Sequence, residues 1–214
     1  MVRVKICGVT REEDLNAVIQ AGADAVGFVV DVEASPRNIS FDEARELIVE
    51  LPNNMDSVAV TVFKRPQRIM KILRELTPTF IQLHGITCEQ LDENNQLSRD
   101  RTIVAIDATS NEALQRARSF SRCVDSILVD TNQSEGLGGT GRVHNWNKSR
   151  YIRDAIRPTH VILAGGLTCE NVGRAIRSVR PYGVDVSTGV EARPGIKDPA
   201  KINAFVKEAK ETVF

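Results

Sequence analysis

The sequence predicts an α/β protein built as a (βα)8 barrel, and three observations lead to this fold class. Eight short β-branched runs alternate along the chain with eight segments of helical periodicity. The runs are nearly continuous in apolar residues, as the strands of a parallel sheet are when both faces are covered. The length of 214 residues fits the lower end of the size range of such barrels. No linker or change in composition marks a second domain, so we expect residues 1–214 to form one.

A doubly wound open sheet is the alternative arrangement of the same alternating pattern. Its dinucleotide-binding form requires a Gly-x-Gly-x-x-Gly turn after the first strand. The first apolar run ends in Cys7 and Gly8, and that motif does not follow. The barrel is therefore the preferred prediction.

The expected elements follow one another in strand–helix order. The strands are residues 2–7, 25–30, 57–62, 80–85, 102–107, 126–131, 160–166 and 183–189. The helices are residues 12–22, 40–51, 65–76, 88–97, 111–120, 148–157, 170–180 and 198–209. Gly22 is suited to close the first helix, and Ser40 with Glu43 three positions later predicts a capping box at the start of the second.

The composition excludes several classes of function. The chain carries 28 basic and 28 acidic side chains, so it has no electrostatic footprint for nucleic acid or an anionic membrane. Aromatic residues make up 5%, too few for a base-stacking platform. No apolar run approaches the roughly 20 residues that span a bilayer. Residues 1–10 lack the apolar segment of a signal peptide, and we expect a soluble, cytoplasmic protein that binds neither nucleic acid nor membrane.

The cysteines are spread singly, without the spacing of a metal site, and we expect them to be reduced. Cys88, Cys123 and Cys169 fall on predicted helices or their ends, which favours a packing role. Cys7 differs because it stands at the C-terminal end of a strand and precedes Gly8. A thiol there is either a small buried hydrophobe or, with local help to ionise, a base. The three histidines are scattered too, so no metal site is expected.

Catalytic groups of a (βα)8 barrel sit at the C-terminal ends of the strands. Polar residues and glycines recur at those ends here, at Cys7, His84, Asp107, Asp130, Gly165, Gly166, Asp185 and Ser187. Each of the three aspartates is either an acid kept protonated by burial or the partner of a loop N–H, and position alone does not choose among them. A structural role and a role in the site are equally consistent with His84.

Two glycine-bearing loops follow the last two predicted strands, AGGL at 164–167 and STGVE at 187–191. Glycine lets backbone N–H groups approach a ligand closely, and the start of a short helix adds the positive end of its dipole. In barrels this pair of loops frequently holds phosphate. Two tight turns without a ligand would give the same pattern, but their joint position favours a phosphorylated small molecule.

Two further loops carry weaker signals. GLGGTG, at 136–141, lies in a long segment over 132–145 that is either a lid over a substrate or a connection without a function. In SPR, at 35–37, Pro36 stiffens the loop and Arg37 offers a planar fork suited to a carboxylate. An ordinary surface arginine beside a turn proline would give the same tripeptide.

Together these motifs resemble the phosphoribosylanthranilate isomerase family, TIM-barrel enzymes of tryptophan biosynthesis. The matching stretches in order are KICGVT, GADAVGFV, SPR, IQLHG, LVDT, GGTG, LAGGL and VDVSTGVE, and the resemblance covers residues 3–211. Any one of these motifs is weak. Eight of them in order at strand ends are specific.

The resemblance implies an aldose–ketose isomerase that needs no metal or organic cofactor. Its reaction is the Amadori rearrangement of N-(5-phosphoribosyl)anthranilate to 1-(2-carboxyphenylamino)-1-deoxyribulose 5-phosphate. By the family's pattern Asp130 is the general acid and Cys7, as thiolate, the general base. Because they end the sixth and the first predicted strands, we expect them to face the substrate from opposite sides of the barrel. The substrate-binding residues would be Arg37, for the anthranilate carboxylate, His84 and Asp185, and the phosphate-binding residues Gly165, Gly166, Thr188 and Gly189. The partner is a phosphorylated small molecule, and the chain is expected to act as a monomer or a homodimer.

One departure from the family's pattern is visible at residues 144–146. His144-Asn145-Trp146 stands where the family commonly has Phe-Asp-Trp. Asn145 can still cap the helix that follows, so we expect the chemistry to be unchanged.

Two other functions compete with this interpretation. The histidine-pathway isomerase performs the same rearrangement on a related compound, but it uses an Asp at the end of its first strand and has visibly similar half-barrels. Here the first strand ends in Cys7 and no half-length repeat is found. A non-catalytic barrel that binds a sugar phosphate would tolerate Cys7→Ser without loss of ligand affinity and would turn over nothing.

Overall fold

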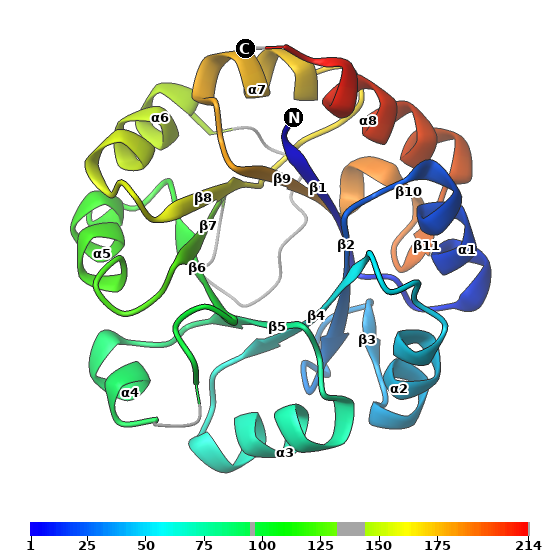
Figure 1. Cartoon of the computed structure of the whole chain (residues 1–214), viewed down its shortest axis with the longest axis horizontal. Helices are drawn as coiled ribbons and strands as arrows, with labels where there is room; N and C mark the ends of the chain where they lie inside the picture. The colour runs from blue at the N-terminus through cyan, green and yellow to red at the C-terminus, as the bar shows by residue number, and fades with distance from the viewer. Residues whose placement is uncertain (95–96, 132–143, 214) are drawn as a thin grey trace.

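The computed structural model describes residues 1–94, 97–131 and 144–213. Its parallel strands close into a barrel surrounded by helices (Figure 1), which confirms the predicted fold class. The barrel closes because β1 pairs with both β2 and β9. The strands of the wall, in spatial order, are β1 (Arg3–Cys7), β2 (Ala25–Val30), β4 (Asp56–Val62), β5 (Phe80–His84), β6 (Thr102–Asp107), β7 (Ser126–Asp130), β8 (His160–Leu163) and β9 (Gly183–Val186).

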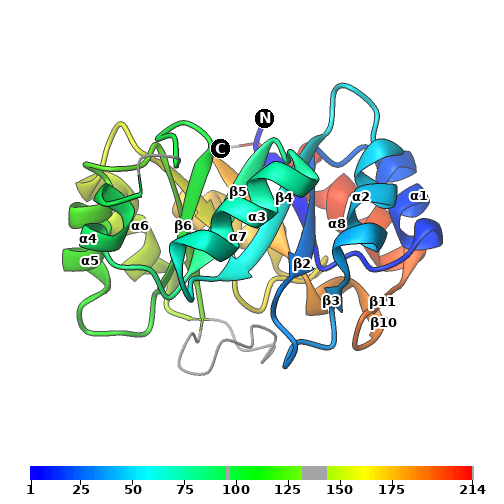
Figure 2. The same cartoon turned by 90° about the horizontal axis from the view of Figure 1, so that it is seen from below.

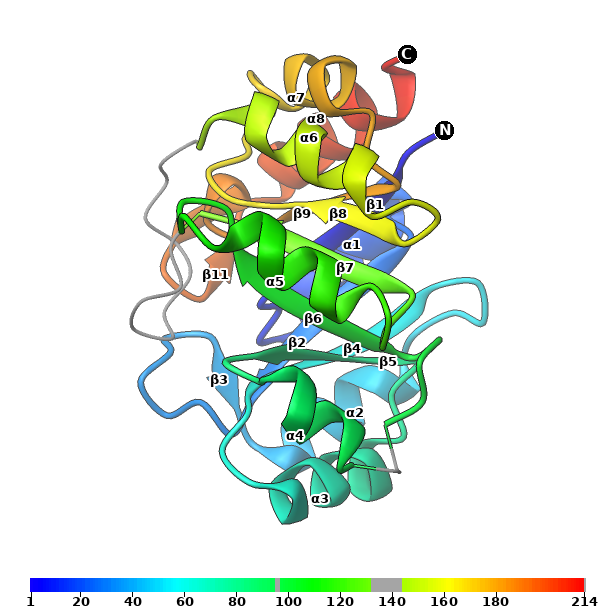
Figure 3. The same cartoon turned by 90° about the vertical axis from the view of Figure 1, so that its left-hand side faces the viewer.

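The helices lie outside this wall and cover it, and Figure 3 shows α5 lying over β6 and β7. They are α1 (Glu12–Ala21), α2 (Phe41–Val49), α3 (Pro66–Leu76), α4 (Cys88–Asp92), α5 (Ala113–Phe120), α6 (Trp146–Ala155), α7 (Val172–Val179) and α8 (Pro199–Glu211). Among the described residues, no helix has the length and apolar character needed to cross a membrane.

Local signals fixed several helix ends as predicted. Gly22 closes α1 in the left-handed conformation, at φ 76°. Ser40 accepts from the N–H of Glu43, and the Glu43 carboxylate accepts from the N–H of Ser40 at 2.7 Å, which completes the capping box. Asn145 caps α6, and its side-chain oxygen accepts from the N–H of Asn147 at 3.0 Å.

Other boundaries differ from the prediction. The helix expected over 88–97 ends at Asp92, where the N–H of Asn94 turns back to the carbonyl of Leu91 at 3.1 Å. The sequence Asn94-Asn95 is a poor helix former, which explains the early stop. The helix expected from residue 148 begins at Trp146.

Three short strands and one helical turn were not predicted. β3 (Asn38–Ile39) extends the sheet beside β2, and β10 (Glu191–Arg193) pairs with β11 (Ile196–Lys197) as a hairpin after the turn η1 (Thr188–Val190). Runs of two or three residues are too short to produce a period-two pattern. Figure 2 shows β3, β10 and β11 at the end of the barrel opposite the N-terminus.

Two apolar layers hold the barrel together. The larger lies between the wall and the helices, and Phe28, Leu83 and Phe205 are wholly buried in it. The smaller layer fills the inside of the barrel, because every second residue of a strand points inward. Its members are Cys7, Ala25, Val29, Val58, Val60, Ile103, Ala105, Leu128, Ile162 and Ala164. A strand therefore presents its last inward residue to the mouth of the barrel.

The expectation that the strands of Cys7 and Asp130 lie on opposite sides of the barrel is wrong. In the observed order β1 is followed by β9, β8 and β7, so β7 is the third strand from β1. The strand diametrically opposite β1 is β6. The two residues thus face the same pocket at an oblique angle.

Candidate active site

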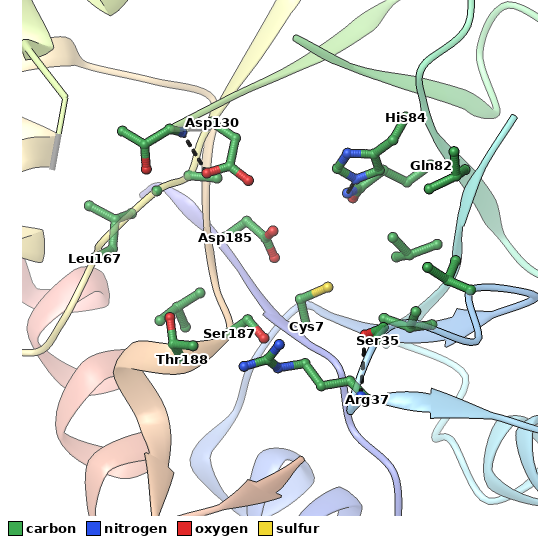
Figure 4. A pocket seen from close by; sticks show the side chains of 18 of the residues that line it. Cys7, Ser35, Arg37, Gln82, His84, Asp130, Leu167, Asp185, Ser187 and Thr188 are labelled. Atoms are coloured by element: carbon green, nitrogen blue, oxygen red, sulfur yellow. Dashed lines mark hydrogen bonds between the residues drawn. The ribbon is translucent and has the colours of Figure 1, made fainter. Parts of the chain in front are cut away.

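One pocket opens at the C-terminal end of the barrel strands, and most of the predicted site residues line it. Figure 4 shows Cys7 and Asp185 in its middle, Asp130 and His84 on opposite walls, and the Arg37 guanidinium below Cys7. The predicted residues on its lining are Cys7, Arg37, His84, Asp130, Gly165, Gly166, Asp185 and Thr188. Gly189 lies in the adjoining hollow, which it shares with Gly166 and Thr188.

The alternation of side chains along the strands explains this convergence. Cys7, His84 and Asp130 end β1, β5 and β7 and point inward in the same period-two register as the apolar interior. Parallel strands present all their C-terminal ends at one edge, so these residues meet there.

The interior below the pocket contains a buried ion pair between the first and last wall strands. The Lys5 ammonium donates to the Asp185 carboxylate at 2.9 Å, and the two residues are direct partners in the register of β1 against β9. Both side chains are less than a tenth exposed. Burial is the largest single effect and lowers the pKa of Lys5, but Asp185 and Cys7 together outweigh it. The pKa is raised, so Lys5 is a cation at neutral pH.

The Cys7 thiol is buried among charged groups. Burial raises its pKa above the usual value, while the cations of Lys5 and Lys197 oppose that rise and the Asp185 carboxylate adds to it. A Cβ on Gly27 of the neighbouring strand would lie 2.9 Å from the Cys7 sulfur. Glycine at position 27 therefore keeps the space beside the thiol open.

Asp130 has the properties of an acid that keeps its proton near neutral pH. Burial, followed by repulsion from the Asp185 carboxylate, raises the pKa of Asp130 to about 7. The N–H of Thr131 donates to one of its carboxylate oxygens at 2.6 Å, which partly opposes the rise.

Arg37 is held from behind by a carboxylate that the sequence did not reveal. Glu191 accepts from the Arg37 Nε at 2.7 Å and from its Nη2 at 2.8 Å. Lys197 donates to the same Glu191 at 3.1 Å, and all three side chains are buried. The two-pronged contact raises the pKa of Arg37 and fixes the plane of the guanidinium. The N–H groups of Arg37 that do not bind Glu191 can donate to another group.

Of the two remaining polar residues at strand ends, His84 lines the pocket and Asp107 lies outside it. His84 lies 3.0 Å, between Nε2 atoms, from Gln82, the preceding inward residue of β5, and both line the pocket. Asp107 ends β6, but its carboxylate accepts from the N–H and hydroxyl of Thr109 in its own loop. Asp107 is not one of the described residues that line the pocket.

The two glycine loops after β8 and β9 pack against each other closely. Gly165 and Gly166 have φ angles of 89° and 64°, which favour glycine. A Cβ on Gly189 would stand 1.9 Å from the carbonyl oxygen of Leu167. Asn171 donates to the carbonyl of Gly166 at 2.9 Å, so the first loop is tied to the start of α7. The close approach of the two loops thus requires glycine at position 189, and the approach of Thr131 requires it at position 165.

The GLGGTG motif and the rest of 132–143 lie outside the described residues. At their border His144 is buried, its ring nitrogen contacts the hydroxyl of Ser149, and burial lowers the pKa of His144 to about 4. Over residues 1–94, 97–131 and 144–213, no group of three or more His, Cys, Asp or Glu side chains is arranged to hold a metal ion.

Three charged residues around the pocket were not singled out by the sequence analysis: Lys5, Glu191 and Lys197. Lys5 left a signal, because it precedes Cys7 by two positions in the first strand and so shares its inward face. Glu191 ends the STGVE motif, but neither it nor Lys197 carries a sign of its ionic partners, because the two lie on a hairpin too short to be recognised.

Comparison with known proteins identifies one family over nearly the whole chain. Its model, N-(5'phosphoribosyl)anthranilate (PRA) isomerase, matches residues 4–208. A relative in Haloferax volcanii named N-(5'-phosphoribosyl)anthranilate isomerase is 45% identical over 212 residues, which are 98% of this chain and 94% of the relative.

Solved structures agree with the sequence comparison. The phosphoribosyl anthranilate isomerase of Thermotoga maritima superposes with a TM-score of 0.86 at 38% identity, over 98% of this chain and 99% of that one. A phosphoribosyl anthranilate isomerase in complex with reduced 1-(o-carboxyphenylamino)-1-deoxyribulose 5-phosphate superposes with a TM-score of 0.83 at 37% identity, with the same coverage of both chains.

We predict that Gly165→Ala destabilises the protein much more than Gly22→Ala. Both glycines have positive φ, at 89° and 76°, but a Cβ at position 165 would lie 2.3 Å from the Thr131 hydroxyl, whereas nothing stands within 4 Å of one at position 22. We expect Gly22→Ala to lower the unfolding free energy by about 1 kcal/mol and Gly165→Ala by more than twice that. Urea unfolding measures both, and equal losses would contradict the crowding at Gly165.

We predict that Asp130→Asn changes the pH dependence of stability. The folded carboxyl keeps its proton up to about pH 7, whereas an unperturbed one loses it near 3.8. The folded state binds more protons between these values, so this group makes stability fall as the pH rises through them. The unfolding free energy of Asp130→Asn should therefore rise relative to that of the parent between pH 4 and pH 7, and this difference should reach its full size above pH 7. Urea unfolding at pH 5 and pH 8 measures it, with the exposed Asp100→Asn as control, and an equal effect at both pH values would contradict the raised pKa.

Proposed function

The chain belongs to the N-(5'-phosphoribosyl)anthranilate isomerase family of tryptophan biosynthesis, and from this premise we propose an acid–base mechanism for the isomerisation, with Asp130 as the acid and Cys7 as the base. The observation that carries the proposal is that a carboxyl with a pKa near 7 and a thiol beside buried cations line one pocket. General acids and bases work best when their pKa values lie near the working pH.

In the first step Asp130 gives its proton to the ring oxygen of the phosphoribosyl group. The bond between C1 and that oxygen breaks, its electron pair stays with the oxygen, and the nitrogen lone pair forms the C1=N bond of an iminium. A raised pKa suits Asp130 to this role because the carboxyl still carries a proton at neutral pH.

In the second step the Cys7 thiolate removes the proton from C2. The C–H electron pair forms the C1=C2 bond, and the C1=N electrons return to nitrogen, so the charge of the iminium is neutralised. The resulting enolamine tautomerises to the ketone. The iminium acidifies the neighbouring C–H, so a thiolate of ordinary basicity suffices and the substrate provides its own electron sink.

Arg37 holds the anthranilate carboxylate in this proposal. Glu191 occupies Nε and one N–H of Nη2, and a guanidinium has five N–H groups, so three donors are left for a substrate. The phosphate would lie against the loops of Gly165, Gly166, Thr188 and Gly189. A solved relative bound to a reduced, phosphorylated carboxyphenylamino-deoxyribulose supports a ligand of this class.

We expect Cys7→Ala and Asp130→Ala each to lower turnover by about a hundredfold or more, because each removes one partner of a proton transfer. The assay follows the loss of fluorescence of phosphoribosylanthranilate made in situ. Cys88→Ala and Asp100→Asn are matched controls outside the pocket and should keep the parent rate. A parent-like rate in either site variant would overturn the assignment of roles.

We expect Arg37→Ala to raise KM with a smaller effect on kcat, because the contact to the carboxylate is present before and during the reaction. The substitution leaves Glu191 beside Lys197 without its main partner, so Arg37→Ala combined with Glu191→Gln is measured alongside. An unchanged KM in both variants would contradict carboxylate binding by Arg37.

A further inference from the structure

Lys5 is a buried cation directly beneath the pocket, and the mechanism above gives it no task. It lies two positions before Cys7 on the inward face of β1, and it is 5% exposed. Lysine is almost never buried this far unless it is paired. Its partner Asp185 accounts for one of its contacts.

Lys5 also lies beside the Cys7 thiol, and each group shifts the pKa of the other: Lys5 favours the thiolate of Cys7, and that thiolate favours the cation of Lys5. The position of a Cβ on Gly27 shows how close they are, because that atom would stand 2.9 Å from the Cys7 sulfur and 3.0 Å from the Lys5 ammonium. Any side chain at position 27 would enter the space that thiol and ammonium share.

The charges around the thiol leave a positive excess. Among the described residues, the cations that act on it are Lys5 of β1, Lys197 of β11 and Arg37 before β3. Asp185 of β9 pairs with Lys5, and Glu191 pairs with both Arg37 and Lys197. Three cations against two carboxylates leave one positive charge, which a thiolate at Cys7 would balance. Asp130 and His84 stand on the other walls of the pocket (Figure 4).

The other two cations are committed elsewhere. Lys197 donates to the carbonyl and hydroxyl of Ser187, at 3.2 and 3.4 Å, and to Glu191. Arg37 makes its two-pronged contact with Glu191. Lys5 differs from them because its ammonium shares the space beside the sulfur and a single carboxylate, Asp185, anchors it from the other side.

We propose that Lys5 is a positioning residue that favours the thiolate form of Cys7 against the effect of burial, and that Gly27 keeps open the space that thiol and ammonium share. The proposal rests on the proposed function for its meaning in catalysis, since a base must be deprotonated to act. Lys5 acts through Cys7 and does not line the pocket. Its charge lowers the free energy of the thiolate relative to the thiol, and Asp185 keeps Lys5 charged and oriented.

The test measures the thiol directly and needs no turnover. In a background with Cys88, Cys123 and Cys169 replaced by Ala, Cys7 is the one remaining thiol of the chain. Its rate of alkylation by iodoacetamide is followed from pH 6 to 11, a range that covers midpoints above the ordinary thiol value, because the thiolate is the reacting form. We expect Lys5→Met to move the midpoint upward by about one pH unit or more, which is a tenfold loss of rate at neutral pH. Lys5→Arg should restore most of the parent profile.

Two further variants keep the test decisive. Lys5→Gln removes the charge but keeps an amide donor for Asp185, so it replaces Lys5→Met if that variant does not fold. Lys210→Met breaks an ion pair with Asp24, which does not line the pocket of the thiol, and should leave the profile unchanged. A parent-like midpoint in a folded Lys5→Met or Lys5→Gln protein would overturn the proposal, as would an equal shift in Lys210→Met.

The result is separable from the isomerase assignment. A shifted midpoint in a protein that does not isomerise phosphoribosylanthranilate would support the charge effect and count against the proposed function. Normal turnover with an unshifted midpoint would support the proposed function and count against the role of Lys5. In an active enzyme the neutral Lys5 variants should lose kcat at pH 7 and recover part of it at higher pH, which loss of a purely structural contact would not produce.

Discussion

The ion pair between Lys5 and Asp185 lies where the first and last strands of the barrel meet, and the geometry of the site depends on it. The two residues are direct partners in the pairing of β1 with β9, and both are buried. A slip of one residue in that pairing would send one of them toward the outer apolar layer without its partner. Such a pair adds little net stability, because desolvation offsets the attraction. Its contribution here is to the register, and the register decides where Cys7 and Asp185 stand.

Each cation of the site that lies near Cys7 is paired with a carboxylate. Asp185 anchors Lys5 below Cys7, and Glu191 holds Arg37 and Lys197 beside it. Asp130 lies beyond these pairs, and burial together with the Asp185 charge raises the pKa of its carboxyl. One carboxylate therefore favours the cation beside the thiol and disfavours ionisation of the acid. Environments that assign opposite protonation states to neighbouring groups are how one site holds both an acid and a base.

The loops complete the site by close contact rather than by extended structure. Gly8 leaves room for the aliphatic part of Arg37, since a Cβ there would stand 2.6 Å from the Arg37 Cδ. Gly195, in the turn between β10 and β11, similarly leaves room for the carbonyl of Pro36. The loop that contains Ser35, Pro36 and Arg37 is thus clamped between the end of β1 and the hairpin. This clamp brings Arg37 to Glu191, although 154 positions separate them in the chain.

The sequence by itself determined the order of strands and helices, the closed fold class and the inward residues at the strand ends. These follow from local regularities, because side chains alternate along a strand and parallel strands expose their C-terminal ends at one edge. Cys7, His84, Asp130 and Asp185 could be placed in one pocket on that basis. The capping residues Gly22, Ser40 and Asn145 were also predictable, since a cap depends on the few residues beside it.

Only the tertiary structure decided which charges are partners. Lys5 and Asp185 are 180 positions apart, and the hairpin that brings Glu191 and Lys197 to Arg37 is too short for a periodic signal. The angle between β1 and β7 likewise follows from the strand order around the closed wall, and the expectation of opposite sides failed there. The physical reason is the same in each case. Periodicity and capping act over a few residues, whereas the electrostatics of a buried site depends on which distant segments the closed barrel brings within contact.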